Sequence, residues 1–420
     1  MHFPLVALGG AAAMAAVMGV GRFAYTPILP AMHAEASLSA ANAGFLATLN
    51  FAGYLLATLW PFLARRLGAV PGPKTTLRFG LATCFAATLA MGLTESVALW
   101  GVLRFVSGFA SALSMIYATT MVLDALARSN RSGAAAIHFS GVGFGISVSG
   151  LMVLLFEQLQ VGWRGMWFGA AAVIALLVPL ALMTVARRTP RAAATTAPAS
   201  VSTPVSAPVS TPVPAPVSAP RQAVVARGRN PWWLVAAYAC AGLGFIISGT
   251  FLPLIAKETP ATAPYAAFCW VIVGLAAIPS NVLWAWVARR AGATASLVVQ
   301  YALQAVAVVL PIFWQTPLAL LVGGLLLGGT FMGIVTVASA RARDIAPQRT
   351  AEMLALMTAC YSVGQIIGPP MAGLIATQTG SFDGGLAIAA GTMVLGIFLL
   401  LMDRASAPAT SEIDRKPLAP

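Results

Sequence analysis

The sequence predicts an all-α polytopic membrane protein with twelve transmembrane helices in two six-helix bundles related by a pseudo-twofold axis. Composition is the first reason. Of the 420 residues, 59% are hydrophobic and 8% are charged, and the mean hydropathy is +0.86, whereas a soluble domain carries about 25% charged residues. The other two reasons are a series of twelve apolar segments and a repeat that relates the two halves of the chain.

Each apolar segment has roughly 20 residues, the length at which a helix crosses about 30 Å of hydrocarbon. The first segment starts near Phe3 without a basic region or a small-residue cleavage site, so we expect a membrane helix rather than a signal peptide. The predicted spans are 4–30, 41–63, 76–94, 97–121, 134–156, 164–185, 232–255, 264–287, 295–314, 317–340, 352–376 and 384–402.

A proline-rich segment separates the sixth and seventh spans. From Val201 to Pro220 the chain reads VSTP VSAP VSTP VPAP VSAP. Proline at every fourth position excludes a helix, so we expect a disordered, partly polyproline-II linker on the cytoplasmic side. The predicted domains are an N-terminal bundle (1–186), this linker (187–230), a C-terminal bundle (231–403) and a cytoplasmic tail (404–420).

The two halves resemble each other in sequence. A Gly-x-Gly followed after seven residues by Leu-Pro occurs at 19–30 and again at 242–253, an offset of 223. An Ala-Arg-Arg-x-Gly-Ala segment occurs at 64–69 and at 288–293, an offset of 224. Parallel repeats of six spans are the plan of major facilitator transporters, in which the substrate lies near the bilayer midplane between the halves.

The distribution of charge orients the spans. Twenty of the 24 Lys and Arg residues fall in loops on the side of both chain ends, and the loops on the other side hold only Arg164 and Lys257. Cytoplasmic loops are rich in Lys and Arg, so we expect both termini in the cytoplasm. The net charge of +13 is scattered over short loops and offers no basic face to a nucleic acid.

Arg22 and Arg104 are the two basic residues inside predicted spans, one and four. A charge at the bilayer centre costs at least about 2.5–3.5 kcal/mol, so such residues are usually functional. At 1.5 Å per residue, both guanidinium groups lie at a similar depth, roughly 13–15 Å from the outer end. Spans one, four, seven and ten line the cavity of a major facilitator transporter. We therefore expect the two arginines to bind an anionic substrate, since each matches a carboxylate or phosphate.

Other roles for these arginines stay open. Each could donate its hydrogen bonds to backbone carbonyls and hold helices together. One of them could instead couple transport to protons or act in gating. All eleven Asp and Glu residues fall in loops, at span ends or in the tail, which argues against export of cationic drugs. The proton-coupling candidates are His138 at the inner end of span five, Arg104, and a span-end acid such as Asp124. A histidine at this shallow depth could equally face water.

Tyr25, Thr26 and Gln365 are the other substrate-binding candidates. We expect Pro27 and Pro30 to break the first helix near its outer end and to free carbonyl groups there. An interfacial aromatic belt explains Tyr25 almost as well, and hydrogen bonding between helices is the common role for a glutamine such as Gln365.

Enzyme and cofactor chemistry find no support in the sequence. The four cysteines lie in predicted spans without metal-ligand spacing. Three scattered histidines form no catalytic cluster, and the segment 68–75 fails the spacing of a phosphate-binding loop. We expect neither catalysis nor a cofactor nor a bound metal.

The motif GRFAYTPILP at 21–30, with GVGFG at 141–145, TFLP at 250–253 and GQIIGP at 364–369, resembles the YbfB/YjiJ family of bacterial major facilitator transporters. The resemblance covers both halves and omits the linker. It implies a twelve-helix secondary transporter of the bacterial inner membrane. Arg104 and Gly108 also resemble a superfamily pattern that is linked to proton coupling. The acidic residue of the superfamily's inner-loop motif is absent, because Arg65 and Arg289 stand in its place.

These observations predict a monomeric secondary transporter that works by alternating access in the lipid bilayer. Its expected substrate is a small organic anion held by Arg22 and Arg104, with proton coupling as an open question. Export of amphipathic compounds is the alternative within transport, and a membrane sensor or scaffold without transport is the alternative from another class.

Overall fold

The computed structural model describes residues 3–66, 72–129, 134–186 and 230–405, together with Gly68 and Arg131. These residues form helices joined by short turns. In chain order the elements are α1 (Phe3–Met14), the π-helix η1 (Ala15–Val20), α2 (Tyr25–Glu35), α3 (Ala40–Arg66), α4 (Pro73–Met91), α5 (Val97–Arg128), α6 (Ala135–Gln158), α7 (Trp163–Ala186), α8 (Trp232–Glu258), η3 (Ala263–Tyr265), α9 (Ala266–Ala291), α10 (Ala293–Phe313), α11 (Pro317–Ile345), η4 (Pro347–Arg349), α12 (Thr350–Thr379) and α13 (Asp383–Ala405).

The elements α1, η1 and α2 follow one another as a single span, so the helices make twelve spans. Eleven are long and apolar enough to cross a membrane. The remaining one, α4, has 19 residues and carries Lys74 and Arg78 near its start, but it packs within the bundle against α5 and α7. The predicted all-α, twelve-helix membrane protein is confirmed.

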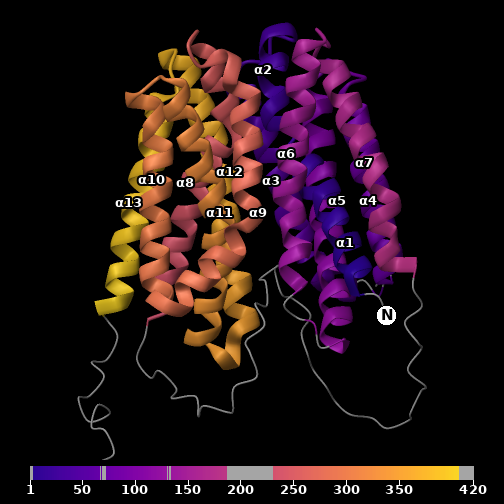
Figure 1. Cartoon of the computed structure of the whole chain (residues 1–420), viewed down its shortest axis with the longest axis vertical. Helices are drawn as coiled ribbons and strands as arrows, with labels where there is room; N and C mark the ends of the chain where they lie inside the picture. Colours follow the sequence, from indigo (N-terminus) through magenta and orange to yellow (C-terminus); the bar gives the residue numbers. More distant parts are fainter. Residues whose placement is uncertain are drawn as a thin grey trace, which may run out of the picture.

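The two halves of the chain form two bundles that stand side by side (Figure 1). The first half contains α1 to α7 and the second contains α8 to α13. We call the end at which α7 stops and α8 starts the linker end, and the other the opposite end. The predicted linker and tail lie outside the described residues, apart from Asn230, Arg404 and Ala405.

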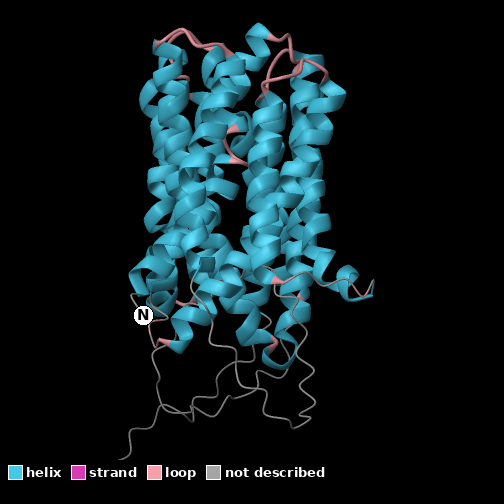
Figure 2. Ribbon diagram, turned by 90° about the vertical axis from the view of Figure 1, so that its right-hand side faces the viewer, coloured by secondary structure: helices cyan, strands magenta, loops and turns pink. Residues whose placement is uncertain are grey.

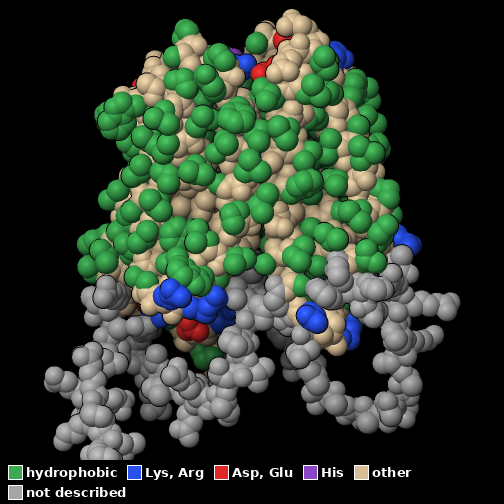
Figure 3. All heavy atoms as spheres, in the orientation of Figure 1, with side chains coloured by type: hydrophobic (Ala, Val, Ile, Leu, Met, Phe, Trp, Pro, Cys, Tyr) green, Lys and Arg blue, Asp and Glu red, His purple; other side chains and the backbone are tan. Residues whose placement is uncertain are grey.

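Apolar side chains cover the sides of the bundles, and Lys and Arg side chains gather near the linker end (Figure 3). Leu56, Phe79, Leu176, Leu318 and Phe398 are among the exposed apolar residues. An apolar belt of this kind faces lipid, because hydrocarbon tails solvate such side chains as well as a protein core does.

Helix α2 packs on α8 across the halves, and two larger pairs of helices join them: α3 packs on α12, and α6 packs on α9. These are spans two and eleven, and spans five and eight. A shift of six spans turns the first pair into the second, so the interface follows the predicted pseudo-twofold axis. The repeat also extends to glycines, because Gly141, Gly145 and Gly150 of α6 match glycines of α12 at the same offset of 223, namely Gly364, Gly368 and Gly373.

Glycine at these positions permits close packing of helices. A Cβ atom on Gly373 would collide with the carbonyl of Ala40 across the interface, and one on Gly150 would lie 2.9 Å from Val271. Small residues allow backbones to approach closely in membrane bundles.

The first span is broken in its middle rather than near its outer end, so the predicted position of the break is wrong. Helix α2 runs through both Pro27 and Pro30. The break lies earlier, at η1 and the turn of residues 21–24, which appears as a short pink segment inside the bundle (Figure 2). Pro27 is tolerated because it sits in the first turn of α2, where an N–H group has no helical partner.

Candidate functional site

A cavity of about 110 Å³ lies between the halves at the depth of the break. The first half contributes side chains from its spans one, two, four and five, and the second half from spans seven, ten and eleven. The lining residues are Met14, Met18, Arg22, Phe23, Tyr54, Met115, Phe139, Val142, Tyr238, Phe245, Phe331, Met332, Val335, Thr358, Tyr361, Ser362 and Gln365.

Arg22 is the charged residue of this cavity and is only 4% exposed. Aromatic rings surround its guanidinium group: the Cζ atom lies 4.3 Å from the ring centre of Tyr54, 4.6 Å from that of Phe51 and 5.5 Å from that of Phe23. Cation–π attraction strengthens when the pair is desolvated. The rings therefore offset part of the cost of burying this charge without an acidic partner.

One edge of the Arg22 guanidinium is buried and only partly hydrogen-bonded. Its Nη2 donates a 3.3 Å hydrogen bond to Oε1 of Gln365, which lies 343 positions away in the other half. Its Nε has no hydrogen-bond partner among the described residues. The Nε–H and Nη2–H groups share one edge of the planar group and are spaced to match the two oxygens of a carboxylate.

A second buried polar atom without a partner among the described residues lies in the same cavity. The Oγ atom of Ser362 makes no hydrogen bond, and the residue is 1% exposed. Ser362 precedes Gln365 by three residues on α12, so the two side chains share one face of that helix. Buried polar groups are normally paired, so unpaired atoms on both walls of one cavity indicate a place for a polar ligand group.

Arg104 has a different position from the one predicted. It lies at the depth of Arg22, as expected, but it does not line the cavity. Its Nη1 and Nη2 donate to the backbone carbonyl of Arg22 over 3.4 and 3.5 Å. Its guanidinium also lies 4.4 Å from the ring centre of Tyr25.

The break in the first span creates these acceptors. Thr26 N donates to Phe23 O and so leaves the Arg22 carbonyl to Arg104. The adjacent carbonyl of Gly21 accepts a 3.1 Å hydrogen bond from Ser107 Oγ. Freed carbonyls in a membrane helix need donors from neighbouring helices. Arg104 and Ser107 supply them and thereby hold the segment from which Arg22 projects.

We expect the variant Arg104→Gln to loosen this segment. An unpaired buried carbonyl costs about 1–3 kcal/mol, so amides in residues 20–26 should exchange hydrogen roughly 5- to 150-fold faster. Hydrogen–deuterium exchange with mass spectrometry measures this rate, and residues 297–303 of α10, which belong to the other half and pack on α9, α11 and α13, provide the internal control. Arg104→Lys should give an intermediate rate. An unchanged rate in both variants would show that Arg104 does not hold the break.

Tyr25 and Thr26 do not line the cavity either. The Tyr25 hydroxyl donates to the Ala43 carbonyl over 2.9 Å, and Thr26 Oγ1 donates across the halves to the Gly249 carbonyl over 2.8 Å. Thr26 and Gly249 are separated by 223 positions, so this bond joins two positions that the repeat makes equivalent.

His138 lies in the first turn of α6, as predicted, but it is buried inside the first half and does not face water. It is 0% exposed. Its Nε2 lies 2.9 Å from Thr119 Oγ1, and its Nδ1 faces Gly10, where an added Cβ would lie 2.5 Å from it. Asp124, the acidic proton-coupling candidate, is exposed on α5.

A family model described as the uncharacterised MFS-type transporter YbfB matches residues 14–401 of the chain. The chain belongs to this family. It is therefore a multi-pass membrane transporter of the major facilitator superfamily and not an enzyme, as the sequence predicts. A comparison with curated proteins gives no match.

Solved structures show the same fold. The crystal structure of the nucleoside transporter NupG matches with a TM-score of 0.69 and 13% identity, covering 96% of this chain and 99% of that one. A variant of NupG matches with a TM-score of 0.68 and 14% identity, covering 95% and 99%. At this identity the likeness extends to the fold alone.

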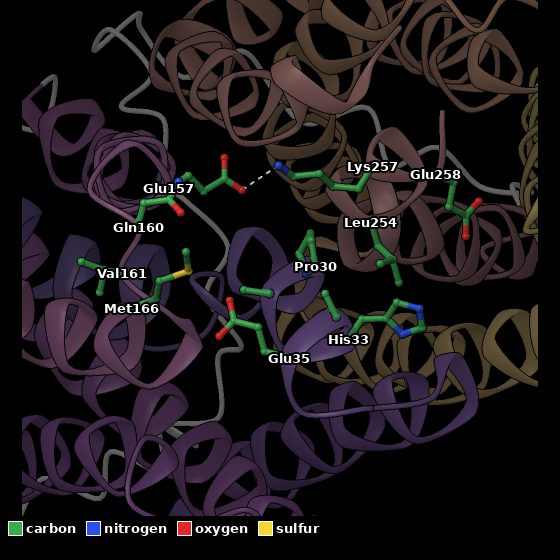
Figure 4. A pocket seen from close by; sticks show the side chains of 12 residues that line it. Pro30, His33, Glu35, Glu157, Gln160, Val161, Met166, Leu254, Lys257 and Glu258 are labelled. Atoms are coloured by element: carbon green, nitrogen blue, oxygen red, sulfur yellow. Dashed lines mark ion pairs between the residues drawn. The ribbon is translucent and has the colours of Figure 1, made fainter. Parts of the chain in front are cut away.

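The MFS transporter is closed between the cavity and the opposite end. Thr48 Oγ1 donates to the Ile366 carbonyl, and Ser147 Oγ donates to the Val271 carbonyl, both across the halves. At the opposite end itself, Lys257 and Glu157 form a 2.9 Å ion pair. This pair spans a vestibule of about 650 Å³ that Glu35 and Val161 also line (Figure 4).

Sequence reasoning missed most of the cavity wall. The repeat offers one signal that could have found part of it, since an offset of 223 relates Arg22 to Phe245 and Val142 to Gln365. All four residues line the cavity. Equivalent positions thus carry a charge in one half and a ring in the other, which makes the site chemically asymmetric.

Proposed function

We propose that this MFS transporter is a secondary active carrier of a small organic anion, which binds with its charged group on Arg22. The observation that carries this proposal is the partly unpaired guanidinium edge of Arg22 between the halves, together with the absence of Asp and Glu from the described residues that line the cavity. A buried charge is stabilised by an opposite charge, and the substrate would supply it.

The walls favour a substrate with an apolar body. Seven aromatic residues and four methionines line the cavity. Methionine side chains adapt to different shapes, and ligand sites are typically apolar with a few fixed polar groups. A neutral substrate, such as the nucleosides for which NupG is named, would leave Arg22 without a counter-charge, and a cation would be repelled by it.

Alternating access fits the contacts between the halves. Because bridges such as Thr26 to Gly249 and Glu157 to Lys257 lie on the opposite-end side of the cavity, they must break for a substrate to pass there. The substrate would bind between the halves, and the bundles would rock around it. Since basic residues concentrate near the linker end, we propose that this end is cytoplasmic.

Thermal unfolding of the purified full-length protein with a panel of ligands tests the proposal. The panel contains carboxylates, the matching neutral amides and the matching amines. A ligand at 100 times its dissociation constant stabilises the folded state by about 2.7 kcal/mol, so we expect carboxylates alone to raise the Tm. Stabilisation by amines or amides only would overturn the anion proposal. Flux of a stabilising carboxylate into proteoliposomes would then establish transport.

A further inference from the structure

We infer that the substrate is an aromatic monocarboxylate, with its carboxylate on the Nε–Nη2 edge of Arg22 and its ring among the aromatic side chains of the cavity. This inference rests on the proposed function, because it specifies which organic anion the same site takes. Three features of the cavity carry it: the single cation, the clustered rings and the small volume.

The polar groups of the cavity can pair with one carboxylate, but they cannot neutralise a second negative charge. A carboxylate accepts both Nε–H and Nη2–H of Arg22 and displaces the 3.3 Å hydrogen bond to Gln365. Ser362 Oγ lies three residues before Gln365 on the same wall and is a free hydroxyl donor. A dicarboxylate or phosphate would bring a second negative charge, and the described lining residues include one cation, Arg22.

The apolar wall is made of rings that already pack as aromatic pairs. Phe245 and Phe331 are stacked with centres 4.8 Å apart and planes at 13°. Phe23 meets Phe331 edge-on at 6.5 Å, and the rings of Tyr238 and Tyr361 lie 4.7 Å apart. A substrate ring among these side chains gains edge and face contacts that a saturated ring lacks.

Both halves supply these rings: Phe23 belongs to the first half, and Phe245 and Phe331 to the second. An aromatic carboxylate would therefore touch both halves with its charged group and with its ring. Binding would link the two bundles at the cavity, as rocking around a central site requires.

The volume of the cavity limits the number of rings that the substrate can have. Drug-sized ligands occupy pockets of roughly 300–1,000 Å³, whereas an apolar protein cavity of about 150 Å³ holds benzene. The cavity measures about 110 Å³, and four flexible methionines line it. This is less than the cavity that holds benzene, so a single ring with a carboxylate is the upper limit of size, and the methionine side chains must move to admit it.

The test compares three probes of similar size on the purified full-length transporter: benzoate, cyclohexanecarboxylate and benzamide. We expect benzoate to bind with a dissociation constant about 2- to 12-fold lower than that of cyclohexanecarboxylate, the range for one favourable aromatic pair. Benzamide should not bind measurably. Thermal shift and isothermal titration calorimetry both report these affinities.

The variants Phe331→Leu and Phe245→Leu test whether the preference for benzoate over cyclohexanecarboxylate arises in the cavity. Each should bring benzoate and cyclohexanecarboxylate to equal affinity while cyclohexanecarboxylate still binds, which also shows that the variant is folded. Phe398→Leu, on the exposed surface of α13, is the matched control and should keep the preference.

Two results would overturn the inference in distinguishable ways. If cyclohexanecarboxylate binds as tightly as benzoate to the parent protein, the site does not select aromatic rings, and the proposed anion transport stands. If neither carboxylate binds while benzamide does, the proposed function fails together with the inference.

Discussion

The variant Arg22→Gln should lose organic-anion binding, with a dissociation constant raised at least about 100-fold. Two charge-assisted hydrogen bonds, from Nε and Nη2, would disappear, and each contributes about 1.5–3 kcal/mol. A tenfold change in affinity corresponds to about 1.4 kcal/mol, so the two bonds together account for a factor of 100 or more. Isothermal titration calorimetry against the carboxylates that stabilise the parent protein measures the loss.

Arg22→Lys should retain part of the affinity, because an ammonium group keeps the charge but lacks the planar pair of donors. The matched control is Arg164→Gln, which removes an exposed arginine paired with Glu95 near the opposite end and should leave binding unchanged. The unliganded Tm of Arg22→Gln should not fall, since burial of a charge in the membrane is itself unfavourable. Unchanged anion affinity in Arg22→Gln would remove this residue from the site.

The variant Gln365→Glu should fill the site with an anion of its own. The new carboxylate would stand where Gln365 now accepts from Arg22 at 3.3 Å and would form a buried ion pair between the halves. To bind, an external anion must displace this carboxylate and leave it unpaired, at a cost of about 3–5 kcal/mol. We expect anion affinity to fall at least about 100-fold and the unliganded Tm to rise.

The combination of these two readouts separates a filled site from a damaged one. A damaged site would lose affinity without gaining thermal stability. Gln378→Glu, an exposed position near the end of α12, is the control for an added negative charge on the same helix and should change neither quantity. If Gln365→Glu bound anions as the parent does, Arg22 and position 365 would not share one ligand site.

Much of the architecture could be predicted from the sequence, because it depends on local properties of the chain. The apolar segments set the spans, since a bilayer requires about 20 apolar residues per helix. The repeat between residues 19–30 and 242–253 predicted the two related bundles. Arg22 was identified as a cavity residue because an intramembrane charge is rare and costly, and the structure places it between the halves.

The prediction for the first span failed for a physical reason that also concerns Arg104. Proline is visible in the sequence, but its effect depends on where the helix starts, and Pro27 falls in the first turn of α2. The break at residues 21–24 is stabilised by donors from another helix, since Ser107 and Arg104 bind the carbonyls of Gly21 and Arg22. Nothing in residues 15–24 alone specifies those donors.

The sequence by itself determined the spans, the two related halves and a buried positive charge in a chain without deep acids. Only the tertiary structure decided which arginine faces the cavity and what surrounds it. The reason is that hydropathy and charge act over a few neighbouring residues, whereas the site is assembled by contacts such as Arg22 with Gln365, which are 343 positions apart. The side of a helix that faces a cavity depends on the packing of all its neighbours.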